Sequence, residues 1–244
     1  RGNHEEHEAL ENEAAAYFGA ETALYFGGGY VANFAIFSTL PQLQERARHV
    51  IIDVSPRLGP LFRRSFPGIT VRTDAWLDDD KPRVRDFDVH IGAASLFKYL
   101  RSSLDMFPKD AAWLRADPGA VAYWRDRLNG LGPGPKVGVS WRSMLLLISR
   151  LSNYATLDEW SPVFRVPGVT FVNLQYGDRA LLEQELQAFE AESDVRIHRW
   201  DDIDYTLDIE SVAALTAACD VVVGAGNFSV RLAGALGIPT VIVG

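Results

Sequence analysis

Several polar side chains come directly after apolar segments in the second half of the chain, where predicted strands end. The segments 136–141 and 169–174 are typical of buried strands, and the residues that follow them are Arg142, Ser143, Gln175 and Tyr176. A guanidinium with neighbouring hydroxyl and amide groups is a donor set that can bind an anion. We therefore expect an anion contact at Arg142, and the alternative for this residue is an arginine that is simply solvated.

A third strand-like segment, 220–224, leads through a glycine-containing turn into a predicted helix. The turn and the start of the helix contain Gly224, Gly226, Asn227, Ser229 and Arg231. The glycines allow a ligand to approach the backbone closely, the helix N-terminus offers amide N–H groups, and the arginine adds positive charge. This pattern predicts a diphosphate-binding turn. The alternative is an ordinary strand-to-helix turn that Asn227 or Ser229 caps.

Candidates for acid–base chemistry lie in the first half of the chain. His90 belongs to the predicted strand 87–91 and Asp88 lies two residues before it, so both could face a ligand at the end of that strand. An imidazole and a carboxylate are common acceptors for the proton of an attacking hydroxyl. The acidic run 78–80 is expected to be a solvated loop, and the histidines show no zinc-binding spacing. We predict no metal site.

The elements that would position these residues alternate between strands and helices. Beyond residue 135 we predict five strands, at 136–141, 169–174, 195–198, 220–224 and 240–243, and four helices, at 157–164, 180–191, 209–218 and 228–236. This alternation indicates an α/β fold with a parallel sheet covered on both faces. Such a doubly wound, Rossmann-like layer has its ligand crevice at the carboxyl ends of the strands. The last strand is expected to be buried.

The first half is expected to form a smaller, incomplete layer of the same kind. Its predicted elements are a helix at 30–45 that breaks at Pro41, strands at 49–54 and 69–71, and helices at 56–65 and 118–131. The cluster Gly132-Pro133-Gly134-Pro135 is the best candidate for a boundary between the two layers.

Composition limits the class of protein. Of the 244 residues, 48% are hydrophobic and 23% charged, which is typical of a globular chain. The net charge of -8 argues against a main affinity for nucleic acid, and the apolar runs are shorter than the roughly 20 residues of a membrane span. The single Cys219 is expected to be a buried thiol, which indicates a reducing, cytoplasmic location. The missing initiator methionine and the uncovered strand 240–243 indicate a fragment.

Several longer motifs follow one another in a familiar order over about 200 residues. They are Val50-Ile51-Ile52-Asp53, Arg64-Ser65-Phe66-Pro67, Val137-Gly138-Val139-Ser140-Trp141-Arg142, Phe171-Val172-Asn173-Leu174-Gln175-Tyr176-Gly177-Asp178 and Leu232-Ala233-Gly234-Ala235-Leu236-Gly237-Ile238-Pro239-Thr240. On these motifs, residues from about 40 to 244 resemble the GT-B-type glycosyltransferase-like C-terminal domain of bacterial tetratricopeptide-repeat proteins.

This resemblance implies a GT-B-like fold with two Rossmann-like halves, an incomplete one at 37–131 and a nucleotide-sugar-binding one at 136–244. It also implies a metal-independent transferase that needs no cofactor. A sugar would pass from a nucleotide-diphosphate donor to a hydroxyl of a glycan, lipid or protein acceptor. The resemblance implies that backbone amides and Ser, Thr or Arg side chains hold the diphosphate. We expect Arg142, Ser143, Asn227, Ser229 and Arg231 to have this role, and Gln175 and Tyr176 to contact the nucleoside.

The sequence departs from that family at two places that matter for catalysis. The family's first-strand Gly-Asp turn is replaced by 30–33, which has no carboxylate, and its late turn with an acid and a histidine is replaced by 226–231, which has neither. The catalytic groups would then be Asp88 and His90, with Asp53 as a further candidate base. A noncatalytic module that binds a glycan or a partner is the alternative function.

The first 36 residues carry motifs of another kind, namely His4, Leu10-Glu11, Phe18-Gly19, Glu21-Thr22-Ala23-Leu24 and Gly29-Tyr30-Val31-Ala32-Asn33. This segment, 1–36, resembles the α-oxoamine synthases, pyridoxal-phosphate enzymes that include 8-amino-7-oxononanoate synthase. The resemblance places Gly28, Gly29 and Tyr30 beside a cofactor phosphate. A complete enzyme of this family needs a lysine that forms a Schiff base with the cofactor, and no later segment has the sequence context of that lysine. The second alternative function is therefore a fragment of such an acyltransferase.

Overall fold

The computed structural model describes residues 39–73, 112–143 and 154–243, together with the single positions Glu13, Asp88, Leu96, Leu100 and Met106. The synthase-like segment 1–36 lies outside the described residues, apart from Glu13. The predicted strand 87–91 lies outside them apart from Asp88, so His90 has no described position. Leu96 and Leu100 are likewise described without their neighbours.

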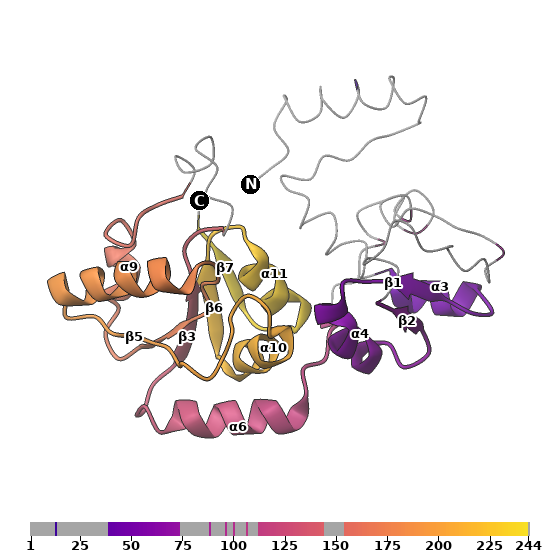
Figure 1. Ribbon diagram of the computed structural model, residues 1–244, viewed down its shortest axis with the longest axis horizontal. Helices are drawn as coiled ribbons and strands as arrows, with labels where there is room; N and C mark the ends of the chain where they lie inside the picture. The colour runs from indigo at the N-terminus through magenta and orange to yellow at the C-terminus, as the bar shows by residue number, and fades with distance from the viewer. Residues whose placement is uncertain are drawn as a thin grey trace.

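A five-stranded parallel sheet forms the second layer (Figure 1). Its strands are β3 (Lys136–Ser140), β4 (Thr170–Asn173), β5 (Ile197–His198), β6 (Val221–Gly224) and β7 (Thr240–Ile242), in the order β5-β4-β3-β6-β7. The chain proceeds from β3 outward to β5 and then returns to the other side of β3 for β6. The strand order therefore reverses between β3 and β6, which is the switch point where ligands of such sheets bind. The predicted α/β fold class is confirmed.

Helices cover both faces of this sheet. They are α6 (Pro118–Asn129), α8 (Ser161–Phe164), α9 (Arg179–Glu192), α10 (Ile209–Ala218) and α11 (Phe228–Ala235). Val139 belongs to one buried cluster with Phe164 of α8 and Leu186 of α9. Val172 and Val222 belong to another cluster, together with the apolar side chains of α10 and α11. Two separate clusters arise because successive side chains of a strand point to opposite faces of the sheet.

Three of these helices, α6, α9 and α10, begin at a capping carboxylate, which belongs to Asp117, Asp178 and Asp208. Each carboxylate accepts a hydrogen bond of 2.8 to 3.0 Å from the amide three residues later. Such caps stabilise the first turn and fix where a helix begins. Accordingly, α10 has the predicted bounds, and α6 and α9 lie within two residues of theirs. Helix α8 is shorter than predicted, since 157–160 forms a turn before it.

The first layer contains α3 (Leu40–Arg46), β1 (Ile51–Asp53), the 3-10 turn η1 (Pro56–Leu58), α4 (Gly59–Ser65) and β2 (Thr70–Arg72). Strands β1 and β2 pair in parallel, as the strand-helix-strand prediction requires. The helix predicted at 30–45 with a break at Pro41 is described only from Leu40 onward. Pro41 lies in the first turn of α3, where its missing N–H costs no helical hydrogen bond, and the helix continues to Arg46.

The two layers share a continuous apolar core, which includes Phe62 of α4 and Leu215 of α10. Polar contacts reinforce it: Arg64 donates through Nε to the carbonyl of Arg115 at 2.9 Å and through Nη1 to Oε2 of Glu210 at 2.7 Å. Helix α6, which the sequence assigns to the N-terminal half, packs against α10 of the second layer. The boundary predicted at 132–135 stays a prediction.

The last strand differs from expectation. The predicted buried strand 240–243 is instead exposed, with Val241 at 50% and Ile242 at 56% of their accessible surface. The reason is its position: β7 ends the sheet order, so in the described part of the chain it pairs with β6 on one side only. Burial of a strand depends on its neighbours as well as on its own apolar residues.

The single cysteine and the lengths of the described helices bear on two predictions made from the composition. Cys219 is buried, as predicted, and its Sγ lies 3.4 Å from the carbonyl oxygen of Leu215. Burial raises the pKa of this thiol to about 12, so it is a packing residue rather than a nucleophile. Among the described helices, none is both long and apolar enough to cross a membrane.

Candidate functional site

The loops that leave β3, β4 and β6 meet at the carboxyl edge of the sheet. We call this region the switch-point edge and define it as residues 140–143, 175–177 and 225–231. Ser140, Gln175 and Asn227 are its buried centre, each at most 2% exposed. The edge therefore brings together the polar residues that the sequence places after these three strands.

Gln175 uses its whole amide group within the protein. Its Oε1 accepts hydrogen bonds from Ser140 Oγ at 3.2 Å and from the Arg142 amide at 3.0 Å. Its Nε2 donates to the Arg142 carbonyl at 2.9 Å and to the Tyr176 carbonyl at 2.8 Å. A primary amide has two donors and two acceptor positions, so all four are occupied. Gln175 thus holds the peptide of Arg142 in place, and its predicted contact with a nucleoside stays a prediction.

Asn227 closes the other side of the edge. Its Nδ2 donates to Ser140 Oγ at 2.7 Å and to the Arg142 carbonyl at 3.0 Å. Its Oδ1 accepts from the Val230 amide at 3.4 Å and caps α11. The capping interpretation of Asn227 is therefore confirmed. Its contacts also tie the turn after β6 to the loop after β3.

Two further polar groups at the start of α11, the Ser229 hydroxyl and the Phe228 amide, also have protein partners. Ser229 is fully buried, and its Oγ donates to the Leu174 carbonyl at 2.6 Å. Tyr176 Oη accepts from the Phe228 amide at 3.3 Å. Two backbone amides at the start of α11, those of Phe228 and Val230, therefore donate to side chains of the protein. The diphosphate contacts predicted for Asn227 and Ser229 are not tested by this geometry.

Arg142 is held by a carboxylate that the sequence analysis missed. Its Nη2 and Nε lie 2.6 and 3.2 Å from Oε2 of Glu185 on α9, and the buried Trp141 donates through Nε1 to Oε1 of the same carboxylate at 2.8 Å. Only one sequence signal was available: Glu185 lies beside the buried Leu186 and hence next to the apolar stripe of α9. Ser143, half-buried, follows in the same loop.

Arg231 is different, because its guanidinium has no counter-ion among the described residues. Its Nε is buried and makes no hydrogen bond within them. The side chain lies over the turn, since a Cβ added at Gly226 would be 3.6 Å from Nη2 of Arg231. Burial lowers the pKa of Arg231 below its usual range, because desolvation disfavours the charged form. An anion at this turn would compensate that cost.

The predicted acid–base residues cannot be joined to this edge from the described residues. Asp88 is exposed and is described without its neighbours, and His90 lies outside the described residues. Asp53 is exposed at the end of β1. Among the residues that the structure describes, no three His, Cys, Asp or Glu side chains gather as metal ligands would.

Lys136, the one lysine with a described position, bears on the pyridoxal-phosphate alternative. It is 5% exposed, and its Nζ donates to the carbonyls of Gly132 at 2.6 Å and Gly134 at 3.0 Å. An amine held in this way is not available to form a Schiff base. Lys81, Lys98 and Lys109 lie outside the described residues.

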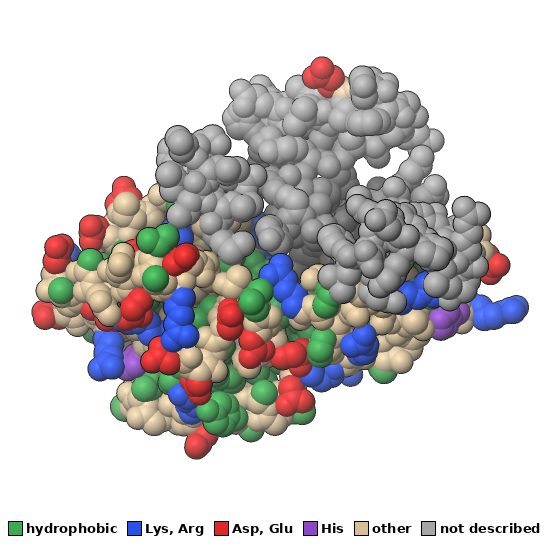
Figure 2. All heavy atoms as spheres, in the orientation of Figure 1, with side chains coloured by type: hydrophobic (Ala, Val, Ile, Leu, Met, Phe, Trp, Pro, Cys, Tyr) green, Lys and Arg blue, Asp and Glu red, His purple; other side chains and the backbone are tan. Residues whose placement is uncertain are grey.

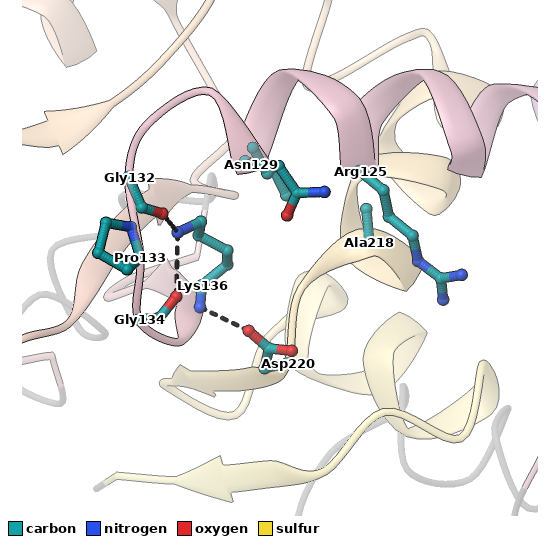
Figure 3. Close-up of a pocket in the computed structure, with 9 residues that line it drawn as sticks. Arg125, Asn129, Gly132, Pro133, Gly134, Lys136, Ala218 and Asp220 are labelled. Carbon is teal, nitrogen blue, oxygen red and sulfur yellow. Dashed lines mark hydrogen bonds between the residues drawn. The ribbon is translucent and has the colours of Figure 1, made fainter.

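A hollow of about 230 Å³ opens at the other end of the sheet, beside the amino ends of β3 and β6 (Figure 3). Lys136, Asp220 and Arg125 contribute its charged groups. Asp220 accepts from the Lys136 amide at 2.7 Å, so this carboxylate also has a structural partner. Since ligands of parallel sheets bind at the carboxyl ends, we do not assign this hollow to the function.

A larger, open hollow of about 540 Å³ lies beside the edge strand β5. Arg199 spans it and pairs with Glu183 and Glu190, at 2.8 Å in each case. The hydrogen bonds from Arg199 hold the pKa of Glu183 below its usual range, and burial lowers the pKa of His198.

Figure 2 shows acidic and basic side chains interspersed over the second layer, without a continuous basic surface on the face in view. The expectation that nucleic acid is not the main ligand rests on the net charge of -8 and stays a prediction.

Comparison with solved structures identifies the fold. The chain is similar to the Escherichia coli ADP-heptose lps heptosyltransferase II, with a TM-score of 0.50 and 12% identity over 85% of this chain and 79% of that one. The fold is GT-B-like. At this identity the likeness concerns the fold alone. No model of a protein family matches the sequence.

Two curated relatives are similar in sequence. Protein FlbA of Caulobacter vibrioides is 40% identical over 197 residues, which are 77% of this chain and 33% of that protein. The 8-amino-7-oxononanoate synthase of Xanthomonas oryzae is 34% identical over 76 residues, 29% of this chain and 19% of the synthase. The chain thus spans a third or less of the length of either relative. The share of this chain that aligns with the synthase is about twice as long as the segment 1–36, for which the resemblance is predicted. The tetratricopeptide-repeat context stays a prediction.

Proposed function

We propose that this GT-B-like chain is a glycosyltransferase domain that binds a nucleotide-diphosphate sugar at the switch-point edge. The sugar would pass to a hydroxyl of a glycan, lipid or protein acceptor. One observation carries the proposal: Arg142 lies on the loop that leaves β3 and Arg231 lies in the first turn of α11, which follows β6, so the two residues are on either side of the point where the strand order reverses.

Two guanidinium groups suit a diphosphate. Each can donate hydrogen bonds to phosphate oxygens, and Arg231 adds a positive charge that has no counter-ion among the described residues. The hydrogen bond of 3.0 Å between Asn227 Nδ2 and the Arg142 carbonyl keeps the two loops in contact. Arg231 has a buried Nε without a protein partner among the described residues, so an anion would satisfy a group that is otherwise costly to bury.

The reaction would be a displacement at the anomeric carbon of the sugar. The acceptor oxygen forms the new bond, the bond to the diphosphate oxygen breaks, and the hydroxyl proton passes to a carboxylate or imidazole, for which Asp53, Asp88 and His90 are the candidates. Negative charge develops on the departing diphosphate. Positioned guanidinium groups stabilise that charge and so favour the transition state.

Calorimetric titration with ADP, UDP and GDP tests the binding step. ADP comes first because the similar solved structure is that of an ADP-heptose heptosyltransferase. We expect one nucleoside diphosphate to bind with a one-to-one stoichiometry, and the variant Arg142→Ala to bind it about tenfold to thirtyfold more weakly. Arg165, which is exposed at the end of α8, supplies the control variant Arg165→Ala with unchanged affinity. A folded protein that binds none of the three nucleotides contradicts the proposal.

The second candidate is a module that binds without turnover. It is favoured by the internal use of the polar groups of Gln175, Asn227 and Ser229, which leaves fewer groups for a substrate. A donor-hydrolysis assay distinguishes the two functions. Nucleotide binding without any hydrolysis or transfer supports the binding module, whereas measurable turnover supports the transferase.

A further inference from the structure

Arg142, which follows β3, is held by more side-chain contacts than the fold requires of a residue at the end of a strand. Gln175 donates to its carbonyl and accepts from its amide, and Asn227 donates to the same carbonyl. Its side chain is fixed as well, by the ion pair with Glu185. The backbone and the guanidinium of one residue are thus held by three side chains from three different elements.

This arrangement has a cost that the fold alone does not explain. Gln175 is fully buried and Asn227 is 2% exposed, and polar side chains in such positions are stable only when every hydrogen bond is made. Apolar residues would fill the same space without that requirement. A network that holds one charged side chain in one orientation is what a binding site needs, because a preorganised group loses little entropy when the ligand arrives.

The ion pair with Glu185 uses only part of the Arg142 guanidinium. Glu185 takes the Nε side of the guanidinium, with contacts to Nε and Nη2, and Nη1 makes no hydrogen bond to a described residue. An arginine has five N–H donors, so three remain for phosphate oxygens. The carboxylate itself cannot turn freely, since the buried Trp141 donates to its other oxygen.

We propose that Glu185 is a positioning residue of the donor site: fixed by Trp141, it orients the guanidinium of Arg142 toward the phosphate groups. This inference rests on the proposed function, and it adds a residue of α9 that does not itself touch the ligand. It differs from a purely electrostatic role, in which the carboxylate would repel the diphosphate and weaken its binding.

A double-mutant cycle on ADP binding tests the inference, with Glu185→Gln, Arg142→Ala and the double variant compared by calorimetry. Glutamine keeps the oxygen that accepts from Trp141, so the fold is retained. We expect Glu185→Gln to weaken ADP binding about tenfold in the otherwise unchanged protein and less than about twofold in the Arg142→Ala background. The weakened variants remain measurable because Arg231 is present in each.

The control is Glu183→Gln, which lies on the same helix and removes an ion pair of the same kind, with Arg199. It should leave the dissociation constant for ADP unchanged. Equal loss from Glu185→Gln in both backgrounds indicates a structural role only, and tighter binding indicates repulsion of the ligand; either result overturns the inference while leaving the proposed function in place. An unchanged protein that binds none of ADP, UDP and GDP overturns both.

Discussion

Gln175→Leu is expected to lower the free energy of unfolding by about 4 kcal/mol, the largest effect on stability that we predict for the switch-point edge. The leucine has a similar volume but no hydrogen-bonding groups. It removes the acceptor of the Arg142 amide and the donor to the Tyr176 carbonyl, both at the carboxyl edge of the sheet. A buried group left without its partner costs about 1–3 kcal/mol, and the amide of Gln175 serves several such groups. Urea unfolding followed by circular dichroism measures the change.

Gln187→Leu is the matched control. Gln187 is exposed on α9 and donates only to Glu183, four residues earlier. Its replacement should change the free energy of unfolding by less than about 0.5 kcal/mol. If Gln175→Leu were equally mild, the network would contribute little, and the positioning of Arg142 would need another explanation.

Arg231→Met is expected to weaken ADP binding at least about tenfold while leaving the midpoint of thermal unfolding unchanged or raising it. The first effect follows from the loss of a guanidinium that has no other counter-ion in the described structure. The second follows from its burial: desolvation lowers the pKa of Arg231, so the folded protein bears a cost for this charge that methionine does not have. Calorimetry and a thermal scan measure the two quantities on one preparation.

Arg165→Met is the control for this prediction, because Arg165 is exposed at the end of α8 and belongs to no described ion pair. Neither its ADP affinity nor its unfolding midpoint should change. A substitution that weakens ligand binding but does not destabilise the fold is typical of a residue that serves binding. A loss of stability in Arg231→Met without a change in affinity would assign Arg231 to the fold instead.

Much of the second layer could be predicted because its signals are local. Helix α10 has the predicted bounds, since the capping residue Asp208 and a continuous apolar stretch define its start and length. The parallel-sheet rule then places the ends of β3, β4 and β6 together, and Arg142, Gln175 and Asn227 do meet there. These predictions needed only strand order in the chain and the direction of each strand.

The remaining features depend on tertiary neighbours. Sequence spacing cannot show that the amides of Gln175 and Asn227 are used up internally, because this follows from the register that places Ser140 opposite Gly224. Glu185 lies on a helix face and shows no motif. The exposure of Val241 depends on the absence of a further strand beside β7 in the described part of the chain.

Hydrogen–deuterium exchange with and without ADP tests the central claim most directly, because it reports where a ligand binds. We predict slower exchange in peptides that cover 140–143 and 224–232, which are the loop after β3 and the turn from β6 into α11. The hollow at the other end of the sheet provides the contrast. Unchanged exchange at the switch-point edge, with protection at 129–136 and 218–220 instead, would contradict a diphosphate site between Arg142 and Arg231.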